Sequence, residues 1–213
     1  ATTEISTLSL HDALPISHEG LAVCEWLNRL GVTAAMLVYR VPNQRDGAYQ
    51  DAQRAVGLVR SRAKDLGIEP DRIGVLGFSA GGHLAARISA HTGPRTYARV
   101  DAADDASCRP DFSVLVYPAY LTTTNAAGGT ELTLPAGKDT PPAILIHAAN
   151  DRITPEGSVA WFLALKRAGV PAELHIYADG GHGFGMKDIP QDIRTWPDRC
   201  ADWMRSRGLL PKP

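Results

Sequence analysis

Short apolar runs alternate along this chain with stretches whose apolar residues recur every three or four positions. The apolar runs predict buried strands, and the wider spacing predicts helices with one buried face. The expected strands are residues 34–39, 72–78, 112–117, 142–146 and 172–177. The expected helices are residues 20–30, 51–66, a segment that opens after residue 79, 158–168 and 196–207. Strands that alternate with helices are typical of a parallel sheet covered on both faces. We therefore predict an α/β fold with a mostly parallel, doubly wound sheet.

A Gly-x-Ser-x-Gly turn at residues 77–81 stands between an expected strand and an expected helix. The pentapeptide alone is common, but this context is typical of a nucleophile elbow, which holds a serine hydroxyl clear of the backbone. Gly77 and Gly81 leave room for the sharp turn. We expect Ser79 to be a nucleophile. The backbone N–H of Ala80 is then expected to face the carbonyl oxygen that becomes negative during attack.

A carboxylate and a histidine follow the serine in the order that such a site uses. Asp151 lies in the loop after an expected strand, where doubly wound sheets place their chemistry. His182 lies in a Gly-rich loop after the last expected strand and is the predicted base. Asp179 is the rival acid, although a residue so close to His182 would more naturally shape the turn. Three other histidines are expected to have structural roles: His83, His147 and His175.

Composition narrows the class of protein. With 213 residues, 44% of them hydrophobic, the chain is long enough for one well-filled domain. A net charge of −1 provides no field that would gather nucleic acid or anionic lipid, and no apolar run approaches the ~18 residues that span a bilayer. The three cysteines match no metal or redox spacing, and no dinucleotide or P-loop fingerprint occurs. We predict no cofactor, no metal, no nucleic acid and no membrane partner.

Five motifs in order along the chain resemble the α/β-hydrolase superfamily. They are Tyr39-Arg-Val-Pro42, Asp51-Ala-Gln-Arg54, Gly77-Phe-Ser-Ala-Gly-Gly-His-Leu-Ala85, His147-Ala-Ala-Asn-Asp151 and Gly180-Gly-His-Gly-Phe-Gly185. Over about residues 18–210 they resemble small bacterial esterases similar to acetylxylan and feruloyl esterases. The resemblance implies Ser79 as nucleophile, Asp151 as acid and His182 as base, in agreement with the choice from the residues. Asn150 stands where the family often has a further aspartate, a change that is expected to matter little.

The first residues depart from that family, whose members have a strand and a Gly-rich loop before the first helix. That loop supplies half of the oxyanion hole through a backbone N–H, and none occurs before His18. Residues 7–16 resemble translated sequencing-adaptor sequence. We therefore expect residues 1–17 to be a foreign leader and residues 18–213 to be an N-terminally truncated hydrolase domain.

The leader still has a predicted structure, because a missing strand would leave backbone groups unpaired in the centre of the sheet. Residues 5–10 alternate apolar with polar positions, which predicts a surrogate strand between the strand at 34–39 and the elbow strand. Residues 11–16 would then replace the Gly-rich loop. Because Pro15 has no N–H, we expect the second oxyanion donor to be misplaced and catalysis to be weak.

The expected reaction is a two-step acyl transfer from an ester. Residues 93–110 and 119–140 lack helical periodicity, which predicts no lid domain and favours short esters that are soluble or attached to a polymer. The resemblance to esterases, together with the open site, implies an acetyl-type ester, either a small molecule or attached to a polysaccharide. The alternative is that these loops are disordered and leave the substrate open. Tyr117, Tyr120 and Ile153 follow strand ends and are candidate pocket walls. Two other functions remain: a serine peptidase of the same fold, and a catalytically impaired fragment that lacks half of its oxyanion hole.

Overall fold

The sheet has six strands, all parallel, in a computed structural model that describes residues 2–8, 16–41 and 43–211. Their order across the sheet is β2-β1-β3-β4-β7-β8. The strands are β1 Thr2–Leu8, β2 Thr33–Leu37, β3 Ile68–Phe78, β4 Phe112–Val116, β7 Ala143–Ala148 and β8 Ala172–Tyr177. The predicted parallel sheet is confirmed.

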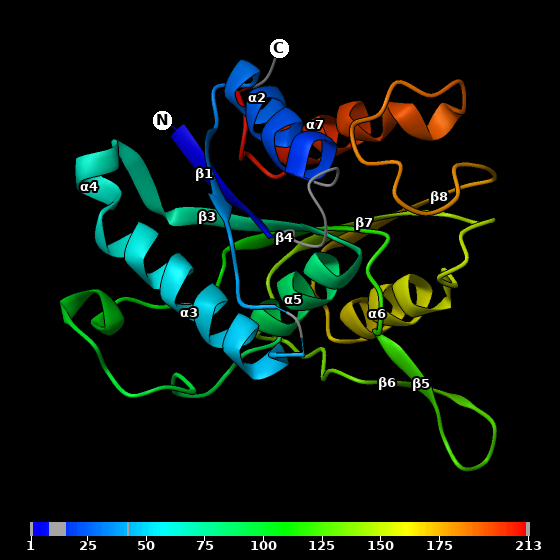
Figure 1. The fold of residues 1–213 in the computed structure, drawn as a ribbon, viewed down its shortest axis with the longest axis horizontal. Coiled ribbons are helices and arrows are strands. Elements are labelled where there is room, and N and C mark those ends of the chain that lie inside the picture. Colours follow the sequence, from blue (N-terminus) through cyan, green and yellow to red (C-terminus); the bar gives the residue numbers. More distant parts are fainter. Residues whose placement is uncertain (1, 9–15, 42, 212–213) are drawn as a thin grey trace.

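Helices cover both faces of this sheet, as Figure 1 shows. The helices on one face are α2 Ala22–Arg29 and α7 Trp196–Ser206, and those on the other are α3 Arg45–Ser61, α5 Ser79–Ser89 and α6 Glu156–Arg167. The shorter turns are η1 Ile16–Leu21, α4 Ala63–Leu66, η2 Ala102–Asp105 and η3 Asp192–Thr195. Helix α3 begins six residues before the start predicted from periodicity, because Ala48 and Tyr49 are buried in a stretch that is otherwise polar. The doubly wound arrangement is confirmed.

The core is divided by the sheet into two layers. Val114 and Val116 of β4 pack into the layer beneath α2 and α7, while Leu115 packs into the layer beneath α3, α5 and α6. Every residue of β4 is buried. A strand buried on both faces reads as a continuous apolar run, and that is why the sequence shows β4 so clearly.

Strand β1 occupies the slot between β2 and β3 where a surrogate strand was predicted. Ile5 lies opposite Ala34 of β2 and Gly74 of β3, both in parallel register. The strand begins at Thr2, three residues before the predicted start, and is described through Leu8. The rest of the predicted strand, residues 9–10, and residues 11–15 of the predicted replacement loop lie outside the described residues.

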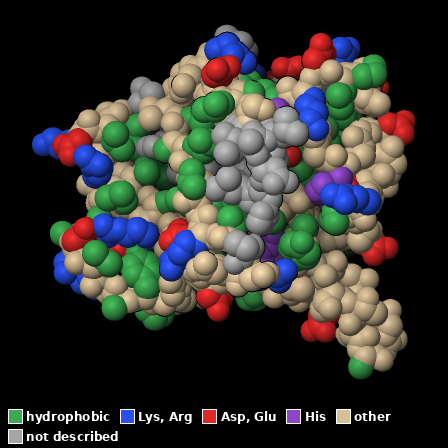
Figure 2. All heavy atoms as spheres, in the orientation of Figure 1, with side chains coloured by type: hydrophobic (Ala, Val, Ile, Leu, Met, Phe, Trp, Pro, Cys, Tyr) green, Lys and Arg blue, Asp and Glu red, His purple; other side chains and the backbone are tan. Residues whose placement is uncertain are grey.

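The two segments without helical periodicity are held by specific contacts, so the alternative of disordered loops is not supported. Residues 119–140 contain an antiparallel ribbon, β5 Thr122–Thr124 and β6 Thr130–Leu132, which projects from the body of the molecule in Figure 1. Figure 2 shows mostly uncharged, non-hydrophobic side chains on this projection. In residues 93–110, Asp101 and Asp104 form ion pairs of 2.6 and 2.9 Å with Arg54 of α3. Polar contacts of this kind leave no periodic apolar signal in a sequence.

Candidate active site

The elbow at Ser79 is a strained strand-to-helix turn. Phe78 ends β3 in an extended conformation, and Ser79 begins α5 with a φ of 50°, a left-handed value that costs a non-glycine residue about 1–3 kcal/mol. A Cβ on Gly77 would lie only 2.2 Å from the carbonyl oxygen of Gly81. A Cβ on Gly82 would lie 2.9 Å from Cα of Pro118. The turn therefore requires glycine at both positions, and it raises the serine above the edge of the sheet.

Ser79, His182 and Asp151 form one hydrogen-bonded chain. Oγ of Ser79 lies 2.9 Å from Nε2 of His182, and Nδ1 of His182 lies 2.9 and 2.8 Å from the two carboxylate oxygens of Asp151. The three residues follow β3, β8 and β7, whose carboxyl ends share one edge of the parallel sheet. A carboxylate can only accept, so Nδ1 carries the proton and Nε2 accepts from the serine hydroxyl. The predicted residues lie together, and their catalytic roles stay a prediction.

The side chains of the three hydrogen-bonded residues are not equally buried. The Asp151 side chain has no exposed surface, whereas 13% of the His182 side chain is exposed. The carboxylate of Asp151 also accepts a hydrogen bond of 2.8 Å from the backbone N–H of Ile153. A shielded, hydrogen-bonded carboxylate holds the imidazole in one tautomer and stabilises the positive charge that it acquires on taking a proton.

Asp179, the rival acid, contacts a different group. Its Oδ1 accepts a hydrogen bond of 3.2 Å from Nδ2 of Asn150, while Oδ1 of Asn150 accepts one of 2.8 Å from the N–H of Gly181. Asn150 thus ties the loop of Asp151 to the loop of His182. The replacement of the family's aspartate by Asn150 was expected to matter little, and this stays a prediction. The two hydrogen bonds of Asn150 give it a bracing role that its place beside Asp151 could have suggested.

His147 is a second buried ring beside Asp151. Its Nε2 is 2.9 Å from the carbonyl oxygen of Ile153 and 3.4 Å from Oδ2 of Asp151, and its Nδ1 is 2.8 Å from Oγ of Ser158. Burial lowers the pKa of His147, which favours the neutral ring. Nε2–H therefore donates toward the carbonyl, and Nδ1 accepts from the serine hydroxyl. The expected structural role is specific: this ring braces the predicted acid.

Tyr117 lies beneath the imidazole rather than in a pocket wall. It is fully buried, and its ring centroid is 4.9 Å from that of His182 and 4.4 Å from that of Phe184. Its hydroxyl donates to Glu19 at 2.6 Å and accepts from the N–H of Gly185 at 3.1 Å. Burial, followed by the charge of Glu19, raises the pKa of Tyr117 well above its ordinary value. Tyr117 thus orders the loop that carries His182.

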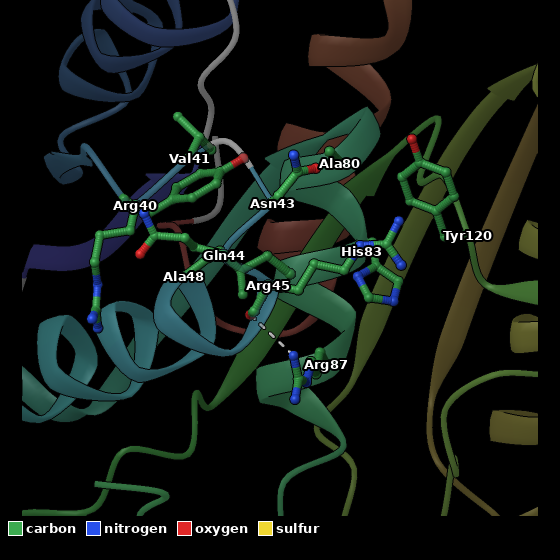
Figure 3. Close-up of a pocket in the computed structure, with 12 residues that line it drawn as sticks. Arg40, Val41, Asn43, Gln44, Arg45, Ala48, Ala80, His83, Arg87 and Tyr120 are labelled. Carbon is green, nitrogen blue, oxygen red and sulfur yellow. Dashed lines mark hydrogen bonds between the residues drawn. The ribbon is translucent and has the colours of Figure 1, made fainter.

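A cavity of about 210 Å³ adjoins the elbow and is drawn in Figure 3. Ala80, His83 and Tyr120 are among the residues that line it, which agrees with the prediction for Tyr120, whereas Tyr117 is fully buried and Ile153 is not among the residues that line this cavity. The Ile153 backbone instead binds Asp151 and His147. His83 was treated as background because its helical position gave no sign of the cavity.

The predicted oxyanion donor, Ala80, is exposed in the first turn of α5. The first N–H groups of a helix have no partner within the helix, so this N–H is available to an oxyanion. The predicted displacement of the second donor concerns residues 11–16, of which 11–15 lie outside the described residues.

Among the described residues, no group of three or more His, Cys, Asp or Glu side chains could hold a metal ion. No helix in the same part of the chain is long and apolar enough to cross a bilayer.

Two family descriptions match adjoining parts of the chain. BD-FAE matches residues 23–115, which include Ser79, and the prolyl oligopeptidase family matches residues 119–206, which include Asp151 and His182. Together these ranges contain all three residues of the hydrogen-bonded chain.

Curated relatives and a solved structure extend the likeness. An acetylxylan esterase of Xylanibacter ruminicola is 29% identical over 87% of this chain and 43% of its own length. Endo-1,4-beta-xylanase B of Butyrivibrio fibrisolvens is 29% identical over 78% of this chain and 30% of its own length. The chain therefore spans less than half the length of these two relatives. The crystal structure of an acetyl ester-xyloside bifunctional hydrolase from Caldicellulosiruptor lactoaceticus matches with a TM-score of 0.86 and 36% identity, over 99% of this chain and 85% of that one.

Proposed function

The chain belongs to the carboxylesterase-type hydrolases of the α/β-hydrolase superfamily, and we propose that it cleaves short acyl esters with Ser79, His182 and Asp151 as its catalytic triad. The observation that carries this proposal is the unbroken chain of hydrogen bonds, 2.9 Å from serine to histidine and 2.8 Å from histidine to aspartate. These distances match the reach that a base needs to take a proton from its nucleophile.

Two half-reactions account for the hydrolysis. Nε2 of His182 takes the Ser79 proton while Oγ attacks the ester carbonyl carbon, and the resulting oxyanion faces the N–H of Ala80. The bond to the alcohol oxygen then breaks, the alcohol leaves with the proton from His182, and the acyl group remains on Ser79. Water next attacks the acyl carbon and passes a proton to His182, which returns it to Ser79 as the acid departs. Asp151 keeps the imidazole oriented and stabilises its positive charge throughout.

The substrate class follows from the site and from the relatives. The cavity of about 210 Å³ beside the elbow is smaller than the roughly 300–1,000 Å³ typical of whole drug-sized ligands, which suits a short or partly enclosed ester. Two relatives carry acetyl esters in their names, an acetylxylan esterase and an acetyl ester-xyloside hydrolase. We therefore favour acetyl esters of carbohydrates as substrates.

Active-site labelling tests this function directly. A fluorophosphonate probe should label Ser79, and the label should be absent in Ser79→Ala but present in Ser61→Ala, whose hydroxyl bonds the carbonyl of Leu58 on α3. Hydrolysis of 4-nitrophenyl acetate should fall roughly 10³-fold or more in Ser79→Ala and in His182→Ala, because triad members act as a unit. Retained hydrolysis in either variant refutes the triad.

A second assay separates the esterase from the peptidase of the same fold. Turnover of 4-nitrophenyl acetate without cleavage of a prolyl 4-nitroanilide supports the esterase, and the reverse refutes it. If the fluorophosphonate labels Ser79 but the protein hydrolyses 4-nitrophenyl acetate slowly, the result matches the loss of one oxyanion donor, which costs about 10²–10³ in kcat.

A further inference from the structure

Among the described residues, those that line the cavity beside Ala80 are basic or neutral, and none is acidic. Of the twelve residues that line it, three are arginine, one is histidine and none is aspartate or glutamate. Because the cavity lies next to the nucleophile elbow, a substrate whose ester is held at Ser79 can place a neighbouring part of itself in the cavity. The electrostatic character of this cavity should therefore select among esters.

Two of the three arginines are already paired. Arg40 forms an ion pair of 2.9 Å with Asp51, and Figure 3 shows its side chain turned away along α3. Arg87 forms an ion pair of 2.8 Å with Asp46, whose side chain is 86% exposed, and also donates to the carbonyl of Arg45. Such an exposed pair contributes little, so it neutralises Arg87 only weakly.

Arg45 is different, because no carboxylate in the described part of the chain forms an ion pair with it. Its guanidinium instead lies 4.8 Å from the ring centroid of Tyr120, which is 53% exposed. Figure 3 shows this side chain reaching across the opening toward Tyr120 and His83. An aromatic face orients a guanidinium without neutralising its charge. Arg45 is thus positioned at the mouth with its charge available to a ligand.

The surrounding groups reinforce this preference for negative charge. Burial, together with Arg45 and Arg87, lowers the pKa of His83 to about 4, which leaves a neutral ring in a positive surrounding. Helix α3, of 17 residues, begins at Arg45, and its N-cap Gln44 makes no side-chain capping bond. The N-terminus of α5 at Ala80 also reaches the cavity. Two helix N-termini add partial positive charge to that of the arginines.

The shape of the cavity indicates which part of the substrate enters it. A wider polar groove of about 580 Å³ shares Arg40, Asn43, Gln44 and Arg45 with it and continues over the start of α3. A small cavity that adjoins a larger polar groove suits the alcohol portion of an ester, particularly a carbohydrate that extends beyond the cleaved bond. Tyr120 provides an exposed ring against which a sugar can pack.

We propose that this cavity binds a carboxylate on the alcohol portion of the ester, so that acetylated acidic sugars of the uronic acid type are preferred over neutral ones. This rests on the proposed esterase function. Arg45 forms the ion pair with the carboxylate, and Tyr120 orients Arg45 for it. Charge-assisted hydrogen bonds are about twice as strong as neutral ones, so a preference of about tenfold is expected at low salt.

The test compares two substrates that differ only in charge. Release of acetate is measured for the methyl glycoside of a monoacetylated glucuronic acid and for its glucuronamide, whose amide is neutral and has similar size. The acidic sugar should have the higher kcat/KM by about tenfold, and raising the salt concentration should shrink the ratio. In Arg45→Gln the ratio of kcat/KM for the acidic sugar to kcat/KM for the glucuronamide should approach one.

Arg62→Gln is the matched control, since Arg62 is an exposed arginine at the opposite end of α3, and it should keep the ratio. An unchanged ratio in Arg45→Gln, or equal rates for the two sugars, overturns the proposal even while 4-nitrophenyl acetate is hydrolysed. 4-Nitrophenyl hemisuccinate carries a carboxylate on its acyl group, and 4-nitrophenyl propionate does not. If the hemisuccinate is preferred over the propionate while the acidic sugar is not preferred over the glucuronamide, the assignment of the cavity to the alcohol portion is overturned.

Failure of the proposed function gives a different result, namely no hydrolysis of any ester. In that case calorimetric titration of Ser79→Ala with the acidic sugar still tests the cavity. Binding that Arg45→Gln weakens about tenfold supports the carboxylate site, and binding that it leaves unchanged overturns it.

Discussion

Replacing Gly77 with alanine should damage catalysis more than it damages the fold. The added Cβ would lie 2.2 Å from the carbonyl oxygen of Gly81, 2.4 Å from its carbonyl carbon and 2.8 Å from the N of Gly82, all backbone atoms. Real contacts of a Cβ stay above 3.0 Å, so the first turn of α5 must move by about 0.8 Å. That turn carries Ser79 and Ala80, and a displacement near 1 Å costs about 10²-fold in rate.

Gly77→Ala should affect the stability of the fold less than it affects catalysis. Overpacking of this kind costs typically 1–3 kcal/mol, and each kcal/mol lowers Tm by about 2–4 °C in a chain of this size. We therefore expect Gly77→Ala to fold, to lose several degrees in Tm, and to lose about 10²-fold in kcat/KM for 4-nitrophenyl acetate. Circular dichroism on heating and steady-state kinetics measure both quantities.

Gly137→Ala is the matched control for Gly77→Ala. Gly137 has no atom within 4 Å of an added Cβ, and its φ lies outside the left-handed region, so its substitution should leave both values unchanged. Normal kinetics in Gly77→Ala would refute the reasoning that close approach of Gly77 and Gly81 positions the nucleophile. A loss of Tm with unchanged kcat/KM would contradict it equally.

Four further outcomes are expected. Asp151→Asn should lower kcat by up to about 10⁴ by disfavouring the correct histidine tautomer, whereas Asp179→Asn should cost little; steady-state kinetics on both variants decide which carboxylate is the acid. His147→Phe should lower Tm and kcat with little change in KM, because it removes both hydrogen bonds of a buried ring beside the acid, and a variant with normal kcat would deny it that bracing role. The pKa of His83 is about 4 in the folded chain and near 6.5 when unfolded, so the unfolded chain binds more protons between these values and the free energy of unfolding falls as pH drops from 6.5 to 4. His83→Gln should flatten that fall in Tm measured against pH, and an identical slope would contradict the assignment. Across nitrophenyl esters from acetyl to decanoyl, kcat/KM should be highest for acetyl or propionyl, and an optimum at eight carbons or more would contradict an open site without large apolar walls.

Local sequence patterns determined the parts of this protein that depend on near neighbours. The apolar runs of β3, β4 and β7 are visible because these strands are buried on both faces. The glycines around Ser79 are visible because a sharp turn admits no side chain there. The order of serine, aspartate and histidine follows from the order of the strands that precede them, and this was enough to select the three residues of the hydrogen-bonded chain.

Tertiary structure alone decided which groups meet across long separations in the sequence. Asp179 is three residues from His182 and Asp151 is 31 residues away, and the folded loops show what each carboxylate contacts: Asp151 bonds the imidazole, and Asp179 accepts a hydrogen bond from Asn150. The brace from His147 depends on how one strand end packs against α6.

The cavity depended on tertiary structure for the same reason. It is assembled from the start of α3, the first turns of α5 and the segment after β4, which are brought together only when the sheet forms. The position of Arg45 against the ring of Tyr120, with no ion pair to a carboxylate of the described residues, became visible only there, because such contacts are a property of the folded surroundings and not of the residue. Sequence periodicity shows which face of a helix or strand is buried, but it does not show which distant residues pack against that face.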